Sequence, residues 1–238
     1  MSRLIRGELI KTLSTRTLFG YTATGLALAV ANVLIVTLGS ELDEVPDKQE
    51  ALAGLPILLL LFGLVGAAGE YRHRTAAPAA LMARRRHGRL LLARASAYAA
   101  TGLAIAALMG VASLALGLPL LTGEPGPALG SGDVAAVVGG SVLAAALSAI
   151  VGVALGALVR SQVAGVVGVL IMVLVVSELI AAISETAVGY TPFGAAAKLA
   201  GDPGGGTLSS GAAALAMAAW AAVLLVAAII GERRRDLA

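Results

Sequence analysis

The sequence has no cysteine, few aromatic residues and little charge. Its 238 residues include three Phe, four Tyr and one Trp, and only 13% of them are charged. Without cysteine the chain can form neither disulfides nor thiolate metal sites, and it has no cysteine nucleophile. A soluble domain carries about 25% charged residues, so this chain has too little charge to cover a water-soluble surface. With a mean hydropathy of +0.93, the composition indicates an integral membrane protein.

Six apolar runs predict an all-α protein with a single transmembrane domain over residues 1–238. A helix needs about 20 mostly apolar residues to cross the hydrocarbon core. The predicted spans are 18–40, 51–69, 95–118, 134–159, 161–184 and 211–231, followed by a tail, 232–238. We expect Pro119 to mark the outer end of the third span. The first run is too long for a cleaved signal peptide.

The charges between the spans predict the orientation. Fifteen of the 17 basic residues fall on one side, whereas the other side has Lys48, Lys198 and nine acidic residues. The positive-inside rule therefore places both termini in the cytoplasm, and an even number of spans agrees with this. We expect a multi-pass protein of the bacterial cell membrane. A net charge of +3 is too small to indicate a nucleic-acid partner.

Small residues recur at close spacing in three spans, which favours tight approach of helix backbones in lipid. These faces serve either packing within one bundle or a seam between two copies. The residues are Gly152 and Gly156, then Gly63, Gly66 and Gly69, then Gly102, Ala106 and Gly110.

Two basic segments lie on the predicted cytoplasmic side. Residues 1–17 form an amphipathic helix that is either a passive lipid anchor or also a contact for a partner. Residues 70–94 hold seven Arg and both His around an apolar stretch, 75–83. This pattern predicts a short helix that docks into a protein groove, and the alternative is a cluster of arginines that binds lipid phosphate. The two histidines are too isolated to indicate a metal site.

The outer loop and the polar residues within the spans supply further candidates. Thr191 and Pro192 read as the start of a short apolar helix that ends at Gly201. This helix either dips into the membrane edge or covers an opening between helices. Asn32 and Glu178 are polar within predicted spans, and Glu178 has either an interfacial role or a role in transport.

The chain carries no sequence motif for an energy source of its own. No Gly-Lys pair occurs, so a phosphate-binding P-loop is excluded, as are the HExxH and GxSxG patterns. A proton-coupled transporter usually has several ionisable groups within the membrane, and only Glu178 is available. The sequence therefore predicts no catalytic or metal site, no enzyme activity and a partner that supplies energy.

Four segments resemble permeases of the type-2 ABC transporter family from actinobacteria. They are GLVGAAGEYRHRT (63–75) with ARRRHGRLLLAR (83–94), RGELIKTLSTRT (6–17), LVRSQVAG (158–165) and YTPFGAAA (190–197). The segments occur in the family's order and spacing, so that the resemblance extends over nearly the whole chain. Each segment alone is only moderately specific. The sequence departs from the family pattern at Ala83, where proline is frequent, and at Arg94, where lysine is frequent.

The resemblance implies an elbow helix before the first span, a cytoplasmic coupling helix between the second and third spans, and an outer re-entrant helix between the fifth and sixth. It implies a dimer of permeases, identical or not, and a separate subunit that binds ATP and magnesium, so that this chain binds no cofactor itself. The residues expected to dock that subunit are Glu70, Tyr71, Arg72, His73, Arg74, Thr75, Pro78, Leu81, Met82, Glu8, Lys11 and Arg16. Those expected along the transport path or its gate are Glu178, Asn32, Tyr190, Pro192 and Phe193.

The leading hypothesis is thus the permease subunit of an ATP-driven ABC transporter, with export as the expected direction. A secondary transporter driven by an ion gradient is one alternative, and a membrane scaffold that transports nothing is another. The substrate does not follow from the sequence, because the spans offer no distinctive polar chemistry.

Overall fold

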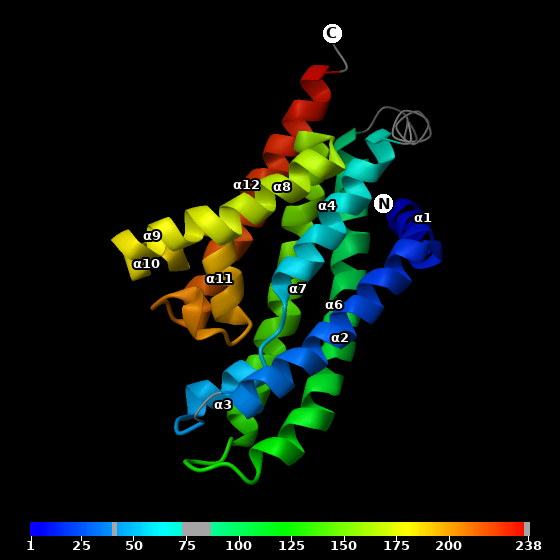
Figure 1. The fold of residues 1–238 in the computed structure, drawn as a ribbon. Helices are drawn as coiled ribbons and strands as arrows, with labels where there is room; N and C mark the ends of the chain where they lie inside the picture. The colour runs from blue at the N-terminus through cyan, green and yellow to red at the C-terminus, as the bar shows by residue number, and fades with distance from the viewer. Residues whose placement is uncertain (40–41, 73–86, 236–238) are drawn as a thin grey trace.

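The computed structural model describes residues 1–39, 42–72 and 87–235, and every regular element in these ranges is helical. Six helical stretches in this part of the chain are long and apolar enough to cross a membrane, which confirms the predicted number of spans. They are α2 (Arg16–Gly39), the stretch Val45–Arg72 that ends in α4 (Pro56–Arg72), α6 (His87–Leu121), α7 (Ser131–Val159), the continuous α8–α9 stretch (Gln162–Ile183) and α12 (Ser210–Arg235). Helix α1 (Ser2–Ser14) and the last turns of α12 lie toward the same end of the bundle (Figure 1).

The predicted second span is interrupted near its start. Residues expected to begin it at position 51 instead end a separate helix, α3 (Val45–Ala51), and α4 starts at Pro56. Proline has no N–H to donate to a preceding turn, and it disfavours helical geometry in the residue before it. The break at 52–55 follows from Pro56, and α4 then continues past the predicted end at 69 to Arg72.

The third span also exceeds its predicted bounds of 95–118. Helix α6 begins at His87 and runs to Leu121, with Pro119 inside its last turn rather than at its end. The added first turns bury Leu90, Leu91 and Ala93. Helix α6 therefore extends beyond its apolar run because one face of the extension packs against the bundle. The predicted docking residues His73, Arg74, Thr75, Pro78, Leu81 and Met82 lie outside the described residues.

Small residues pack α4 directly against α7. A Cβ added to Gly152 would collide with the carbonyl oxygen of Leu60, and one added to Gly156 would lie 3.0 Å from the backbone nitrogen of Ala68. A Cβ at Gly63 would likewise collide with the carbonyl oxygen of Ala149. This close backbone contact confirms that these glycines serve packing within the bundle. Helix α7 lies at its centre and also contacts α6 and α12.

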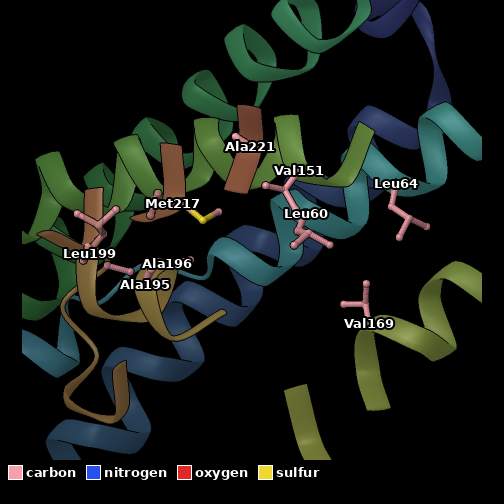
Figure 2. Packing of buried hydrophobic residues seen from close by; sticks show 12 residues of the cluster. Leu60, Leu64, Val151, Val169, Ala195, Ala196, Leu199, Met217 and Ala221 are labelled. Atoms are coloured by element: carbon pink, nitrogen blue, oxygen red, sulfur yellow. The ribbon is translucent and has the colours of Figure 1, made fainter. Parts of the chain in front are cut away.

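A second layer of contacts joins α12 and the short helix α11 (Pro192–Leu199) to this centre. Figure 2 shows Met217 of α12 close to Ala195 and Ala196 of α11, while Leu60 of α4 lies beside Val151 of α7. Helix α11 starts as predicted, because Thr191 caps it by accepting a hydrogen bond from the Gly194 N–H at 3.0 Å.

The fifth span leans away from the bundle (Figure 1). It consists of α8 (Gln162–Ile171), the π-helical turn η1 (Met172–Val176) and α9 (Ser177–Ile183). Only 6% of its apolar part is buried, against 56% for the stretch Val45–Arg72 and for α7. The chain then returns toward the bundle through α10 (Glu185–Gly189) and α11, and a 3₁₀ turn, η2 (Pro203–Gly205), precedes α12.

Adding a methyl group to α7 tests the packing of α4 on α7. We expect Gly152→Ala to destabilise the protein by about 1–3 kcal/mol, because the methyl group meets backbone that cannot move aside. The control is Gly139→Ala on the same helix, where a Cβ meets open space, and it should leave stability unchanged or raise it slightly. Thermal unfolding of both variants in detergent measures the difference. Equal stability of the two variants would contradict this account.

Candidate functional site

Four charged side chains meet at the end of the bundle where α1 and the last turns of α12 lie (Figure 1). We call Glu8, Lys11, Glu70 and Arg94 the ion cluster. Glu8 and Lys11 come from α1 (Ser2–Ser14), Glu70 from the last turn of α4, and Arg94 from the second turn of α6. Arg94 is only 2% exposed, Glu70 6% and Glu8 8%. Three helices from separate parts of the chain are thus joined through buried charge.

Arg94 is the centre of the ion cluster. One guanidinium nitrogen donates to Glu70 Oε2, and Nε lies 3.5 Å from Glu8 Oε2. Lys11 Nζ donates to the other oxygen of Glu70 and lies 3.8 Å from Glu8 Oε2. Burial lowers the pKa of Lys11; Glu8 opposes this shift and Arg94 adds to it. The two carboxylates and Arg94 therefore balance where water has little access, and Lys11, whose side chain is 45% exposed, reaches Glu70 from the outside.

Helix α1 turns two polar residues toward the bundle. Glu8 and Thr12 are its buried residues, whereas Met1, Ile10 and Leu13 are more than half exposed. The exposed side combines Ile10 and Leu13 with Arg3 and Arg6, and such a mixture of apolar and basic residues suits the interfacial region of a bilayer. The ion cluster explains this orientation, because Glu8 reaches Arg94 only when its own side of the helix faces α6.

A second polar group lies at the same end, between α4, α8 and α12. The Tyr71 hydroxyl donates to Glu232 Oε1 at 2.5 Å, and the Arg160 guanidinium lies 4.7 Å from the centre of the Tyr71 ring. Arg72 Nη1 donates to Gln162 Oε1 at 3.2 Å, and Gln162 Nε2 donates to the Val65 carbonyl at 3.0 Å. Neighbouring residues at the end of α4 thus link that end both to α12 and to the start of the fifth span.

Of the predicted docking residues, the structure brings Glu8, Lys11 and Glu70 together, but it turns both carboxylates inward. Both carboxylates form ion pairs within the chain, so they orient the helices around them and are not exposed to a partner. Arg16 and Arg72 are exposed and Tyr71 is half-buried. An outside partner can reach Arg16 and Arg72.

The predicted transport-path residues are divided among different places. Asn32 holds α3 at the opposite end of the bundle, where its amide donates to the carbonyls of Glu50 at 3.0 Å and Ala51 at 3.3 Å. Pro192 and Phe193 line a cavity of about 470 Å³ between the fifth span and the bundle. Tyr190 is 57% exposed, and its carbonyl accepts a hydrogen bond from Trp220. Glu178 is exposed and does not line this cavity.

The central residue of the ion cluster, Arg94, was not among the predicted site residues. It lies just before the predicted third span, where the sequence offers it as one of seven arginines in a basic segment. Its only distinguishing feature in the sequence is its position between Leu90–Ala93 and Ala95–Ala97, within an apolar surrounding. Such a surrounding would have suggested a buried cation, and the isolated acids Glu8 and Glu70 would then have been its candidate partners.

The described residues contain no group of three or more His, Asp or Glu side chains that could hold a metal ion. Their charged groups are arranged to join helices. No protein-family model matches the chain, and no curated protein matches its sequence.

Removing the central cation should destabilise the ion cluster. Arg94→Met leaves Glu8 without its buried partner and Glu70 with fewer cations, at a cost of about 3 kcal/mol or more. The control is Arg89→Met, at an exposed position on the same helix, which should change stability by no more than about 0.5 kcal/mol. Unfolding in detergent measures both values. A loss in Arg94→Met no larger than in Arg89→Met would show that the ion cluster contributes nothing to stability.

Proposed function

We propose that this chain is the permease subunit of an ATP-driven ABC transporter, acting in export. The observation that carries the proposal is the ion cluster, which fixes α1 to the two helices that flank residues 73–86. In the family that the sequence resembles, the corresponding segment docks the ATP-binding subunit. A displacement of that segment would reach α1, α4 and α6 together, because Arg94 joins all three.

The arrangement of the spans supports a mechanical role. The end of α4 is bonded to the start of the fifth span through Arg72 and Gln162, and to α12 through Tyr71 and Glu232. In contrast to α4, the fifth span has few contacts that would hold it in one position. A movement at the basic end can therefore change its angle to the bundle. ATP binding and hydrolysis by the partner subunit would drive this movement, since the chain has no P-loop.

A docking experiment tests the proposal. We expect the chain to hydrolyse no ATP alone and to copurify with a P-loop subunit, for which a neighbouring gene is the first candidate. Arg72→Glu combined with Arg74→Glu should lower copurification at least fivefold, because both charges lie in or beside the segment proposed to dock. The control is Arg233→Glu combined with Arg234→Glu, which reverses two exposed charges at the same end and should copurify normally. Undiminished copurification and transport in the first variant would contradict the docking assignment.

Glu178 separates this proposal from a transporter driven by an ion gradient. Because Glu178 is exposed and lies outside the cavity, Glu178→Gln should leave ATP-driven transport within about twofold of the unmodified protein, as expected for a surface substitution. The measurement is substrate uptake into inside-out vesicles. Transport by the chain alone, driven by an ion gradient and abolished by Glu178→Gln, would favour the alternative.

A further inference from the structure

The cavity behind the fifth span has the form of a membrane groove. Its volume of about 470 Å³ lies within the range of about 300–1,000 Å³ that is usual for small-molecule sites. One wall is the fifth span itself, and the other walls are parts of α4, α7, α11 and α12. Leu64 of α4 and Val169 of α8 point toward one another across it (Figure 2). Since most of its walls are membrane-spanning helices, the groove lies at the depth of the hydrocarbon core.

The few polar groups on the walls already have partners within the chain. The Ser177 hydroxyl donates to the Met172 carbonyl at 3.0 Å, and the Thr191 hydroxyl donates to the Val188 carbonyl at 2.7 Å. The Trp220 indole N–H donates to the Tyr190 carbonyl at 2.8 Å. The groove therefore offers no hydrogen bond that a ligand would have to satisfy, and an aliphatic chain suits it best.

The fifth span is irregular where it forms the wall. Its π-helical turn contributes Met172 and Val176 to the groove. Such turns are rare, and they occur frequently at functional sites. Gly168, one turn earlier, also lines the groove, and a Cβ added there would meet nothing within 4 Å. The open space beside Gly168 shows that the chain itself leaves this part of the wall unfilled.

Two arginines adjoin the end of the groove at Val159 and Ala164: Arg160 follows Val159 in the chain, and Arg72 is bonded to Gln162. Val159 is the last groove residue of α7, and Arg160 follows it in the left-handed conformation, with φ at 57°. The guanidinium of Arg160 lies over the Tyr71 ring, and its buried Nε donates no hydrogen bond within the described residues. Arg72 lies next to Tyr71 and is exposed. Arg160 and Arg72 thus place two guanidinium groups beside this end of the groove, and they complement an anionic headgroup.

We propose that the groove binds an anionic phospholipid from the leaflet at this end, with an acyl chain along Gly168, Met172 and Phe193 and the phosphate at Arg160 and Arg72. Binding of a lipid in this groove does not depend on the proposed function, because it requires no ATP-binding partner. That the lipid is also the transported cargo rests on the proposed function.

Photolabelling tests the site on the full chain in nanodiscs. The probe is a phosphatidylglycerol with a diazirine in its acyl chain, and a phosphatidylcholine with the same chain is the comparison. We expect labelled peptides to concentrate at residues 168–176 and 193, with at least threefold more label from phosphatidylglycerol. Gly168→Phe fills the groove and should lower this labelling at least fivefold. Gly139→Phe, where a Cβ also meets open space outside the groove, should leave it unchanged.

A separate variant tests the proposed contact between the lipid headgroup and Arg160. Arg160→Gln should retain labelling by both lipids but reduce the preference for phosphatidylglycerol to about one, whereas Arg89→Gln, at an exposed arginine of the same end, should keep the preference. Label spread evenly over all lipid-facing spans, or labelling unaffected by Gly168→Phe, would overturn the proposal. So would rapid disulfide formation between two copies of Gly168→Cys with the groove unlabelled, because a second copy would then cover it. Loss of the site with normal ATPase copurification would reject only this inference, whereas an intact site without an ATPase partner would reject only the proposed function.

Discussion

Two carboxylates buried at the edge of a membrane protein require a cation, and Arg94 supplies it. Glu8 and Glu70 are each less than 10% exposed, and a buried carboxylate without a partner costs several kcal/mol. The requirement fixes how α1 lies on the bundle, since Glu8 reaches Arg94 from only one face of its helix. It also sets the distance between the ends of α4 and α6, which flank residues 73–86.

The rest of the bundle divides into a part held tightly and a part held loosely. Helices α4 and α7 approach through glycines until their backbones touch, and α7 then carries α6 and α12. The fifth span has no comparable packing, and polar bonds hold its first residues to α4. The molecule therefore contains a tightly packed centre and a loosely packed fifth span, joined at the end where the charges gather. This division suits a transporter subunit, and it also leaves space for a lipid.

Much of the fold could be predicted from the sequence because hydropathy and charge are properties of local segments. The six spans and the Thr191 cap of α11 each follow from a few neighbouring residues. The role of Gly152 does not, because the sequence allows either packing within the bundle or a seam between two copies, and only the contact with α4 decides it. The break before Pro56 is also a local feature, because proline disfavours helical geometry in the residue before it. The ion cluster could not be predicted in the same way, since Glu8, Glu70 and Arg94 are far apart in the chain and their meeting depends on how α1 folds back. The groove depends on the angle of the fifth span, which no local pattern determines.

The central claim is that Arg94 and Glu70 stabilise each other as a buried pair and so join α4 to α6. A double-mutant cycle with Glu70→Gln, Arg94→Met and both together measures this most directly, through unfolding in detergent. The account predicts a coupling of about 1.5–3 kcal/mol, with the double variant more stable than the sum of the single losses implies. Additive losses, with a coupling below about 0.5 kcal/mol, would contradict it.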